Sequence, residues 1–235
     1  MRKMIEVRKL TKRFGLKTVL RGLDFEVQAG EFVALLGPNG AGKTTFLRIL
    51  ASLSRPSMGK VKIAGYELPG QAAAVRARLG VVSHLPLLYP DLTAQENLEF
   101  YARMYGIRHH ASRITQVLEM VGLQARRHDL VRTFSRGMQQ RLAIGRAVLH
   151  DPDVMLFDEP YTGLDQDASA MLDDVLKTVA AQGRTVVMTS HDLARAEDLA
   201  TRFDILSRGA IAASITRDSL GKDNLLSFYK QALAA

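Results

Sequence analysis

Cysteine is absent from the 235 residues of this chain. Without it the chain has neither disulfides nor thiolate metal sites, and it fits a reducing compartment. No apolar run approaches the ~20 residues that a membrane-spanning helix requires. Residues 1–9 are charged and lack the apolar core of a secretory signal. We therefore expect a protein that is soluble by itself.

An excess of acidic residues is also missing, and the net charge is +8. The basic residues are scattered and form no helix stripe or arginine-rich tail, so we expect no direct binding of nucleic acid. A moderately basic surface suits a nucleotide binder, or a subunit that lies against an anionic membrane face. With 47% apolar residues, the chain can form one large α/β domain, or a core with an attached subdomain.

Residues 31–45 organise the rest of the chain. The apolar run 32–36 predicts a buried strand, which is followed by a glycine-rich turn and a helical pattern. Gly37, Gly42, Lys43 and Thr44 satisfy the phosphate-loop pattern G-x-x-x-x-G-K-[ST] in this strand–turn–helix context. The alternative is a glycine-rich turn without a ligand. The residues expected around the phosphates are Gly37, Pro38, Asn39, Gly40, Ala41, Gly42, Lys43, Thr44 and Thr45.

Two polar side chains of this loop have expected partners. Lys43 would reach the β- and γ-phosphates, and the hydroxyl of Thr44 would ligate Mg²⁺. The backbone amides and the helix N-terminus would point at the same anion. The loop thus predicts binding of a nucleotide triphosphate with its metal ion.

The patterns before and after this loop differ. Apolar and polar residues alternate in the front third, which predicts an antiparallel β layer, with residues 5–10 as an edge strand. Residues 93–150 have a helical pattern without a strand candidate, and Thr93 with Glu96 resembles a capping box. We expect an inserted helical subdomain here.

Strand patterns then return. Residues 154–157 and 185–189 are apolar runs typical of a buried parallel sheet, with a helix over 164–182 between them. Residues 202–206 and 210–212 predict a hairpin, and an amphipathic helix is expected from residue 218 onward. The domain prediction is a nucleotide-binding core of residues 1–83 and 151–235, with a helical subdomain of residues 84–150.

Asp158 and Glu159 follow the apolar run 154–157, at the strand end where open parallel sheets bind ligands. Asp158 would hold Mg²⁺ through water, because Mg²⁺ gives up its hydration shell reluctantly. Glu159 is placed to take a proton from an attacking water, which makes it the candidate general base. The alternative is a pair of solvated acids at a strand end.

Four motifs in order carry a resemblance to a known family. Residues 134–141 (FSRGMQQR) resemble the ABC signature, and residues 158–160 (DEP), 162–165 (TGLD) and 189–192 (TSHD) follow at the expected spacing. Over essentially the whole chain, the sequence resembles an ABC transporter ATPase. The resemblance implies an α/β P-loop NTPase with a RecA-like parallel core, an antiparallel β layer and an inserted helical subdomain.

The resemblance also implies roles for further residues. Phe14 matches the aromatic residue that stacks on adenine, although a phenylalanine of the core is the alternative. Ser135 and Gly137 would cap the γ-phosphate of ATP held by the opposite subunit of a head-to-tail dimer. Asp165 resembles the residue that communicates across that dimer, and His191 the switch histidine at the γ-phosphate.

The implied cofactors are ATP and Mg²⁺. The implied partners are transmembrane permease subunits and a second copy of this chain, or a paralogue. The expected location is cytoplasmic, on the inner face of the cell membrane.

Two departures from the family pattern bear on function. The signature has Arg136 and Met138 in place of glycine and glutamine, which leaves Ser135 and Gly137 as its phosphate-binding elements. His84 replaces a glutamine that touches Mg²⁺, and imidazole is a poor Mg²⁺ ligand, so His84 is expected to act through water or mainly as a coupling contact. A histidine there resembles the ATP-binding subunit of the heme exporter of cytochrome c maturation. Residues 134–138 (FSRGM) and 158–165 (DEPYTGLD) look similar to the same subfamily.

The leading prediction is therefore the ATP-hydrolysing subunit of a membrane exporter, with heme export as the preferred pathway and a drug or lipid exporter as the alternative. A non-transport ABC protein would need a second cassette or a long coiled-coil insertion. A plain nucleotide-binding or kinase module does not explain the signature or His191.

Overall fold

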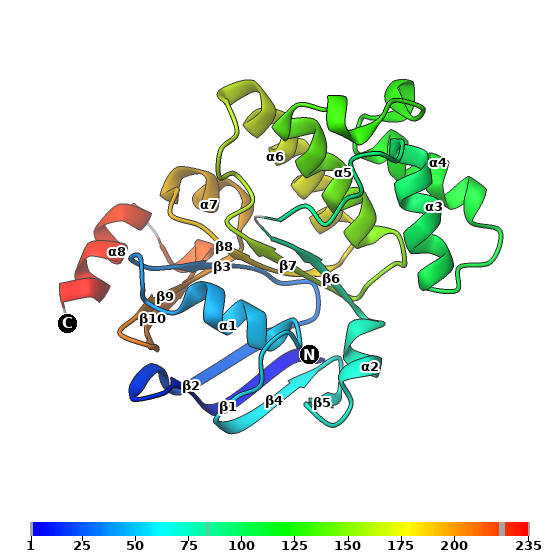
Figure 1. The fold of residues 1–235 in the computed structure, drawn as a ribbon. Helices are drawn as coiled ribbons and strands as arrows, with labels where there is room; N and C mark the ends of the chain where they lie inside the picture. Colours follow the sequence, from blue (N-terminus) through cyan, green and yellow to red (C-terminus); the bar gives the residue numbers. More distant parts are fainter. Residues whose placement is uncertain (1, 84, 221–223, 235) are drawn as a thin grey trace.

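The computed structural model describes residues 2–83, 85–220 and 224–234, and its core contains two β-sheets with α1 (Lys43–Leu50) between them (Figure 1). The α/β architecture predicted from the sequence is confirmed. Within the described residues, no helix combines the length and apolar character needed to cross a membrane.

The larger sheet has the strand order β10-β9-β3-β8-β7-β6. Its strands are β3 (Phe32–Leu36), β6 (Leu79–Val82), β7 (Val154–Asp158), β8 (Thr185–Thr189), β9 (Arg202–Ser207) and β10 (Ala210–Thr216). All neighbouring pairs are parallel except β9 and β10, which form the predicted hairpin. Every residue of β3, β7 and β8 is buried, which explains their continuous apolar runs.

The smaller sheet is antiparallel, in the order β2-β1-β4-β5. Its strands are β1 (Lys3–Phe14), β2 (Lys17–Gln28), β4 (Met58–Ile63) and β5 (Tyr66–Leu68). The prediction of an edge strand at residues 5–10 is wrong, because β1 lies between β2 and β4. The alternating pattern instead reflects a sheet with one buried and one exposed face, which gives interior strands the same pattern as edge strands.

The helices lie on both sides of the parallel sheet (Figure 1). They are α1, α2 (Ala72–Arg76), α3 (Ala94–Met104), α4 (His110–Met120), α5 (Arg136–Val148), α6 (Gln166–Ala181), α7 (Leu193–Leu199) and α8 (Leu225–Ala234), with 3₁₀ turns at Gln124–Arg126, Val131–Thr133 and Arg217–Ser219. α3, α4 and α5 gather away from the antiparallel sheet. Residues 93–150 contain no strand, only an isolated bridge between Thr93 and Leu130. The predicted capping box is confirmed at α3.

Two hydrophobic cores use opposite faces of the parallel sheet. Val33 and Leu35 of β3 belong to the core shared with α1 and the antiparallel sheet. Phe32, Ala34 and Leu36 belong to the core that packs against the helices on the other face. Because side chains alternate along β3, one face of the sheet packs against α1. The loop before α1 lies at the edge of the sheet where β3 ends.

Gly80 of β6 lies where the parallel sheet packs against α5, and replacing it tests that packing. A Cβ at Gly80 would lie 2.3 Å from Sδ of Met155 and 2.5 Å from the carbonyl oxygen of Ala147. The side chain of Met155 can move, but a shift of the α5 backbone would cost stability. We expect Gly80→Ala to lower the free energy of unfolding by about 1–3 kcal/mol in urea titrations. Gly70→Ala is the control, because a Cβ there meets nothing within 4 Å, and equal losses would contradict this packing account.

The ring of His150 should make the stability of the protein depend on pH. Its ring stacks on Tyr105 with centroids 3.9 Å apart, and burial lowers the pKa of His150 to about 4. The unfolded chain therefore binds a proton more readily, so stability falls as the pH drops from 6.5 toward 4, by about 3 kcal/mol. His150→Phe keeps the stacking and should remove this loss in urea titrations across that pH range. An unchanged pH profile would contradict the assignment.

Candidate functional site

A cavity of about 1160 Å³ lies where the parallel strands β3, β7 and β8 end. Most of the glycine-rich loop lines it, together with residues 17–19 and 21 of β2, Glu159, Thr162 and His191 from the loops after β7 and β8, and Arg208 and Gly209 from the β9–β10 turn. This is the edge of an open parallel sheet at which ligands bind.

The glycines let the loop curl around this cavity. Gly42 has φ +112°, a backbone conformation that favours glycine, and α1 begins at the next residue. A Cβ on Gly37 would lie 2.2 Å from the carbonyl oxygen of Leu206, so the loop packs directly on the end of β9. The N-terminal amides of α1 thus border the cavity and favour an anion there.

Lys43 is buried between the loop and the end of β7. Its Nζ donates to the carbonyl oxygens of Gly37 at 2.7 Å and Pro38 at 3.4 Å, and it lies 3.8 Å from Oε1 of Glu159. Because its hydrogen-bond partners are backbone oxygens, a bound phosphate could take their place.

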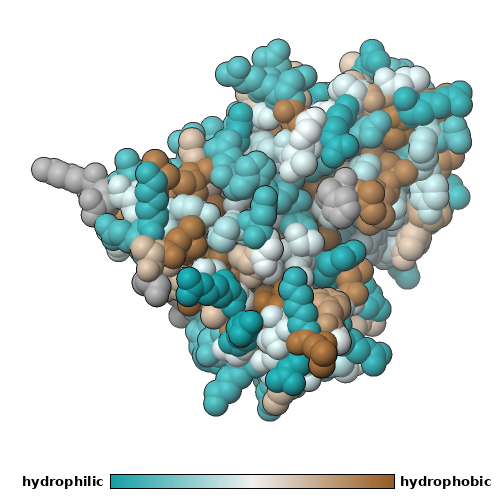
Figure 2. Space-filling view, turned by 60° about the vertical axis from the view of Figure 1, so that its left-hand side comes forward, coloured by the Kyte–Doolittle hydropathy of each residue, from teal (hydrophilic) through white to brown (hydrophobic). Residues whose placement is uncertain are grey.

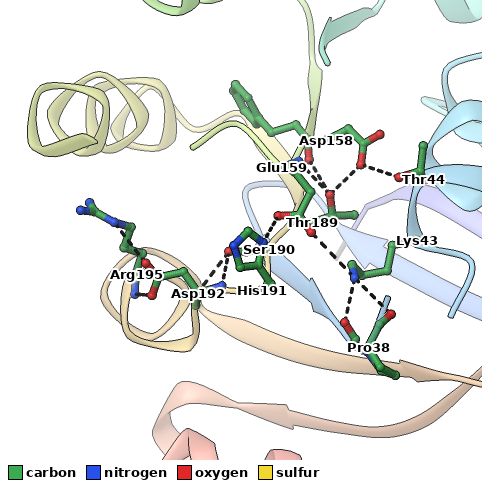
Figure 3. Close-up of polar contacts among 12 residues, drawn as sticks. Pro38, Lys43, Thr44, Asp158, Glu159, Thr189, Ser190, His191, Asp192 and Arg195 are labelled. Carbon is green, nitrogen blue, oxygen red and sulfur yellow. Dashed lines mark hydrogen bonds and ion pairs between the residues drawn. The ribbon is translucent and has the colours of Figure 1, made fainter. Parts of the chain in front are cut away.

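Asp158 is held at the end of β7 by two hydroxyl groups (Figure 3). Its Oδ1 accepts hydrogen bonds from Oγ1 of Thr189 at 2.8 Å and from Oγ1 of Thr44 at 3.2 Å. Carboxylate and hydroxyl oxygens are the ligands that Mg²⁺ prefers, so the donor set present here fits that ion.

Thr189 is a site residue to which the sequence analysis gave no role. It stands opposite Asp158 in the β7–β8 register, and its Oγ1 also accepts the backbone N–H of Glu159 at 3.0 Å. A threonine at the end of a buried parallel strand was the available signal. Thr189 therefore orients both acids at once.

Glu159 and His191 meet at the mouth of the cavity. Nδ1 of His191 lies 2.7 Å from Oε2 of Glu159, and Glu159 has φ +50°, which is uncommon for a residue with a side chain. A strained backbone at a position of this kind is often part of a functional site.

Phe14 lies at the end of β1, outside the residues that line the cavity. The residue is 55% exposed, and Nζ of Lys12 lies 4.7 Å from the centroid of its ring. The alternative of a core phenylalanine is therefore wrong. Lys17, its partner across the β1–β2 turn, does line the cavity, so Phe14 stands beside the cavity mouth.

The signature residues are ordered but do not line the cavity of their own chain. Ser135 caps α5 by accepting the N–H of Met138 at 3.3 Å, and Asp165 caps α6 by accepting the N–H of Ala168 at 2.8 Å. A Cβ on Gly137 would lie 2.6 Å from Cβ of Ala168, so the two helix N-termini pack side by side.

Arg136 and His84 both depart from the family pattern, and the structure describes only the first of them. Arg136, in place of a signature glycine, donates through Nε to the carbonyl oxygen of Thr162 at 3.2 Å. His84 lies outside the described residues. The structure thus brings together the phosphate loop, Asp158, Glu159 and His191, and it places Ser135, Gly137 and Asp165 elsewhere.

Comparison with known proteins shows the family of this chain. The family model described as ABC transporter matches residues 20–162. The linearmycin resistance ATP-binding protein LnrL of Bacillus subtilis is 36% identical over 219 residues, which are 92% of this chain and 70% of that protein. The Nod factor export ATP-binding protein I of Burkholderia pseudomallei is 40% identical over 207 residues, covering 87% of this chain and 68% of the relative.

Solved structures are similar along most of the chain. An ATP-binding subunit of an ABC transporter superposes with a TM-score of 0.87 at 31% identity, covering 97% of this chain and 99% of the other. An ATP-binding cassette in a dimeric post-hydrolysis state with ADP and Pi gives a TM-score of 0.81 at 28% identity, covering 91% and 99%. The chain belongs to the ABC transporter family, of which it carries the ATP-binding domain.

Proposed function

We propose that this protein is the ATP-hydrolysing subunit of an ABC-type exporter. The observation that carries the proposal is that Lys43, Thr44, Glu159 and His191 line one cavity behind a phosphate loop, with Asp158 hydrogen-bonded to Thr44. The family match supports an ATP-binding domain, and the post-hydrolysis state of one similar structure supports hydrolysis.

Each residue has a distinct part in the proposed reaction. The loop amides and Lys43 hold the triphosphate and balance its charge, with Phe14 beside the adenine. Glu159 accepts a proton from the water that attacks the γ-phosphorus, and ADP leaves as the bond to the γ-phosphoryl group breaks. His191 orients Glu159 and contacts the γ-phosphate. Thr44 and Asp158 would hold Mg²⁺, which neutralises charge on the phosphates.

The complete site requires a second copy. Ser135 and Gly137 stand outside the cavity of their own chain, yet the N-terminus of α5 is suited to an anion. In a head-to-tail dimer, this helix end would close the ATP held by the other chain, and Asp165 would contact the opposite site. The dimeric similar structure supports pairing, while a paralogue in place of the second copy remains the alternative.

An exposed apolar surface supports a membrane-embedded partner. Large apolar side chains are exposed between residues 85 and 105, namely Leu85, Leu87, Tyr89, Phe100, Met104 and Tyr105. Figure 2 shows hydrophobic patches among hydrophilic residues on the upper lobe of the molecule. We assign this surface to transmembrane permease subunits, which would hold the protein at the cytoplasmic face of the membrane.

The transported compound is proposed by analogy. The two relatives above are named for linearmycin resistance and Nod factor export, and these names favour the drug or lipid exporter over heme export. Heme export rests only on the resemblance of His84, residues 134–138 and residues 158–165 to that subfamily.

Two measurements test the proposal. The purified chain should hydrolyse ATP in a Mg²⁺-dependent reaction, and membrane subunits should copurify with it from detergent-solubilised cells. Absence of hydrolysis, with or without those subunits, would refute it, and copurification with ribosomes instead would favour a non-transport ABC protein.

A further inference from the structure

Behind Glu159 and His191 lies a cluster of polar side chains that the proposed reaction does not use. The hydroxyl of Tyr161 donates to Oδ1 of Asp173 at 2.5 Å, and NH1 of Arg195 binds Oδ2 of the same carboxylate. The guanidinium of Arg195 lies 5.0 Å from the centroid of the Tyr161 ring. We call Tyr161, Asp173 and Arg195 the clamp.

The clamp joins three segments that are separate in the sequence. Tyr161 lies in the loop after β7, Asp173 on α6 and Arg195 on α7. The side chains of Asp173 and Arg195 are 22% and 24% exposed, so solvent screens their attraction only in part. Burial raises the pKa of Tyr161, and its hydroxyl therefore stays protonated and able to donate.

Both ends of the clamp lie close in the sequence to the reacting side chains, Glu159 and His191. Tyr161 is separated from Glu159 only by Pro160. Arg195 binds Asp192 at 3.3 Å, and Asp192, the residue after His191, caps α7 by accepting the N–H of Arg195 at 3.1 Å (Figure 3). The clamp thus fixes the loop that carries Glu159 to the helix that follows His191.

The Glu159–His191 pair needs such support. Within the described residues, the hydrogen bond to Glu159 is the only one that the His191 side chain makes, and that side chain is 68% exposed. Glu159 itself has a positive φ. Thr189 already holds the backbone N–H of Glu159, and a second tie between the two loops fixes the relative position of the two side chains more closely.

We propose that Tyr161, Asp173 and Arg195 are positioning residues that set the distance between Glu159 and His191 for ATP hydrolysis. This inference rests on the proposed function. The clamp residues do not line the cavity, so they act on turnover through Glu159 and His191 and leave nucleotide binding unchanged.

The test is a double-mutant cycle on ATP hydrolysis. Asp173→Asn and Arg195→Gln should each lower kcat about tenfold, because a displacement of well under 1 Å at the reacting groups already has an effect of this size. The KM for ATP should change less than about twofold. The double variant should lose no more than either single variant, since the two residues act as one unit. Arg195→Lys should recover part of the loss.

A distant ion pair supplies the matched control. Arg184 is buried, and its NH2 binds Oδ1 of Asp151 at 2.7 Å beyond the opposite end of the parallel sheet. Asp151→Asn should lower stability without lowering kcat. Tyr161→Phe, which removes only the hydroxyl, tests the clamp if the charge variants fail to fold.

The outcomes separate this inference from the proposed function. Absence of hydrolysis by the unmodified chain would refute both. Normal hydrolysis together with an unchanged kcat in the folded clamp variants, additive losses in the double variant, or an equal loss in Asp151→Asn would overturn the clamp alone.

Discussion

Replacing Glu159 with glutamine is expected to lower kcat for ATP hydrolysis by about 10²–10⁴-fold while leaving ATP binding nearly intact. The amide keeps the size of the carboxylate but cannot accept the proton of the attacking water, and general-base catalysis typically contributes this much. Lys43, 3.8 Å from Oε1 of Glu159, keeps its backbone partners Gly37 and Pro38, so the phosphate loop should stay formed. Phosphate release and binding of a fluorescent ATP analogue are the two measurements.

The experiment compares turnover with ATP binding, and it needs a control variant for both. Glu67→Gln changes an acidic residue of β5, outside the residues lining the cavity, and should leave both quantities unchanged. We also expect Glu159→Gln to accumulate as an ATP-bound dimer in size-exclusion chromatography. Unchanged hydrolysis would show that another group takes the proton, and loss of ATP binding would show that Glu159 mainly supports the loop.

Replacing Lys43 with alanine should produce the largest loss of nucleotide affinity. The ammonium group is buried beside the loop, where hydrogen bonds to a charged group contribute about 1.5–3 kcal/mol, which corresponds to about 10–150-fold in Kd. Hydrolysis should fall at least as far, since the same charge faces the phosphates in the transition state. Isothermal titration with ATP measures the affinity.

Lys17 provides the comparison, because it lines the same cavity but is exposed at its mouth. Lys17→Ala should weaken binding by less than about threefold, and the effect should fade at high salt. If the two lysine variants bind ATP equally well, the phosphates of ATP are not bound at Lys43 of the phosphate loop.

The features predicted best from the sequence are those encoded locally. The phosphate loop, the apolar runs that became β3, β7 and β8, and the acids that end β7 each depend on a short stretch of residues. Glycines that must adopt a positive φ, and runs buried on both faces, leave a direct mark in the sequence.

The features that were missed either depend on contacts between distant segments or are too short to show a pattern in the sequence. The position of β1 inside its sheet is set by pairing with β4, and the sequence pattern of a half-buried strand does not record its neighbours. The short helices α2 and α7 were not predicted, because their few turns carry little periodicity. The joint contact of Thr189 with Asp158 and Glu159 became visible only through the register of β7 and β8.

The domain boundaries at residues 83 and 151, and the roles of Ser135, Gly137 and Asp165, stay predictions. The close approach of Gly137 to Ala168 shows only that the N-termini of α5 and α6 pack against each other.

In the proposed head-to-tail dimer, one chain supplies Lys43 and another supplies Ser135 to the same ATP. Mixing two inactive variants, Lys43→Ala and Ser135→Arg, and measuring hydrolysis tests this arrangement. In a mixed head-to-tail dimer, one site combines the intact loop of one chain with the intact α5 N-terminus of the other, so activity should return to as much as about a quarter of the wild-type rate. A mixture as inactive as its components, with both variants folded and dimeric, would contradict the account, as would full activity of Ser135→Arg alone.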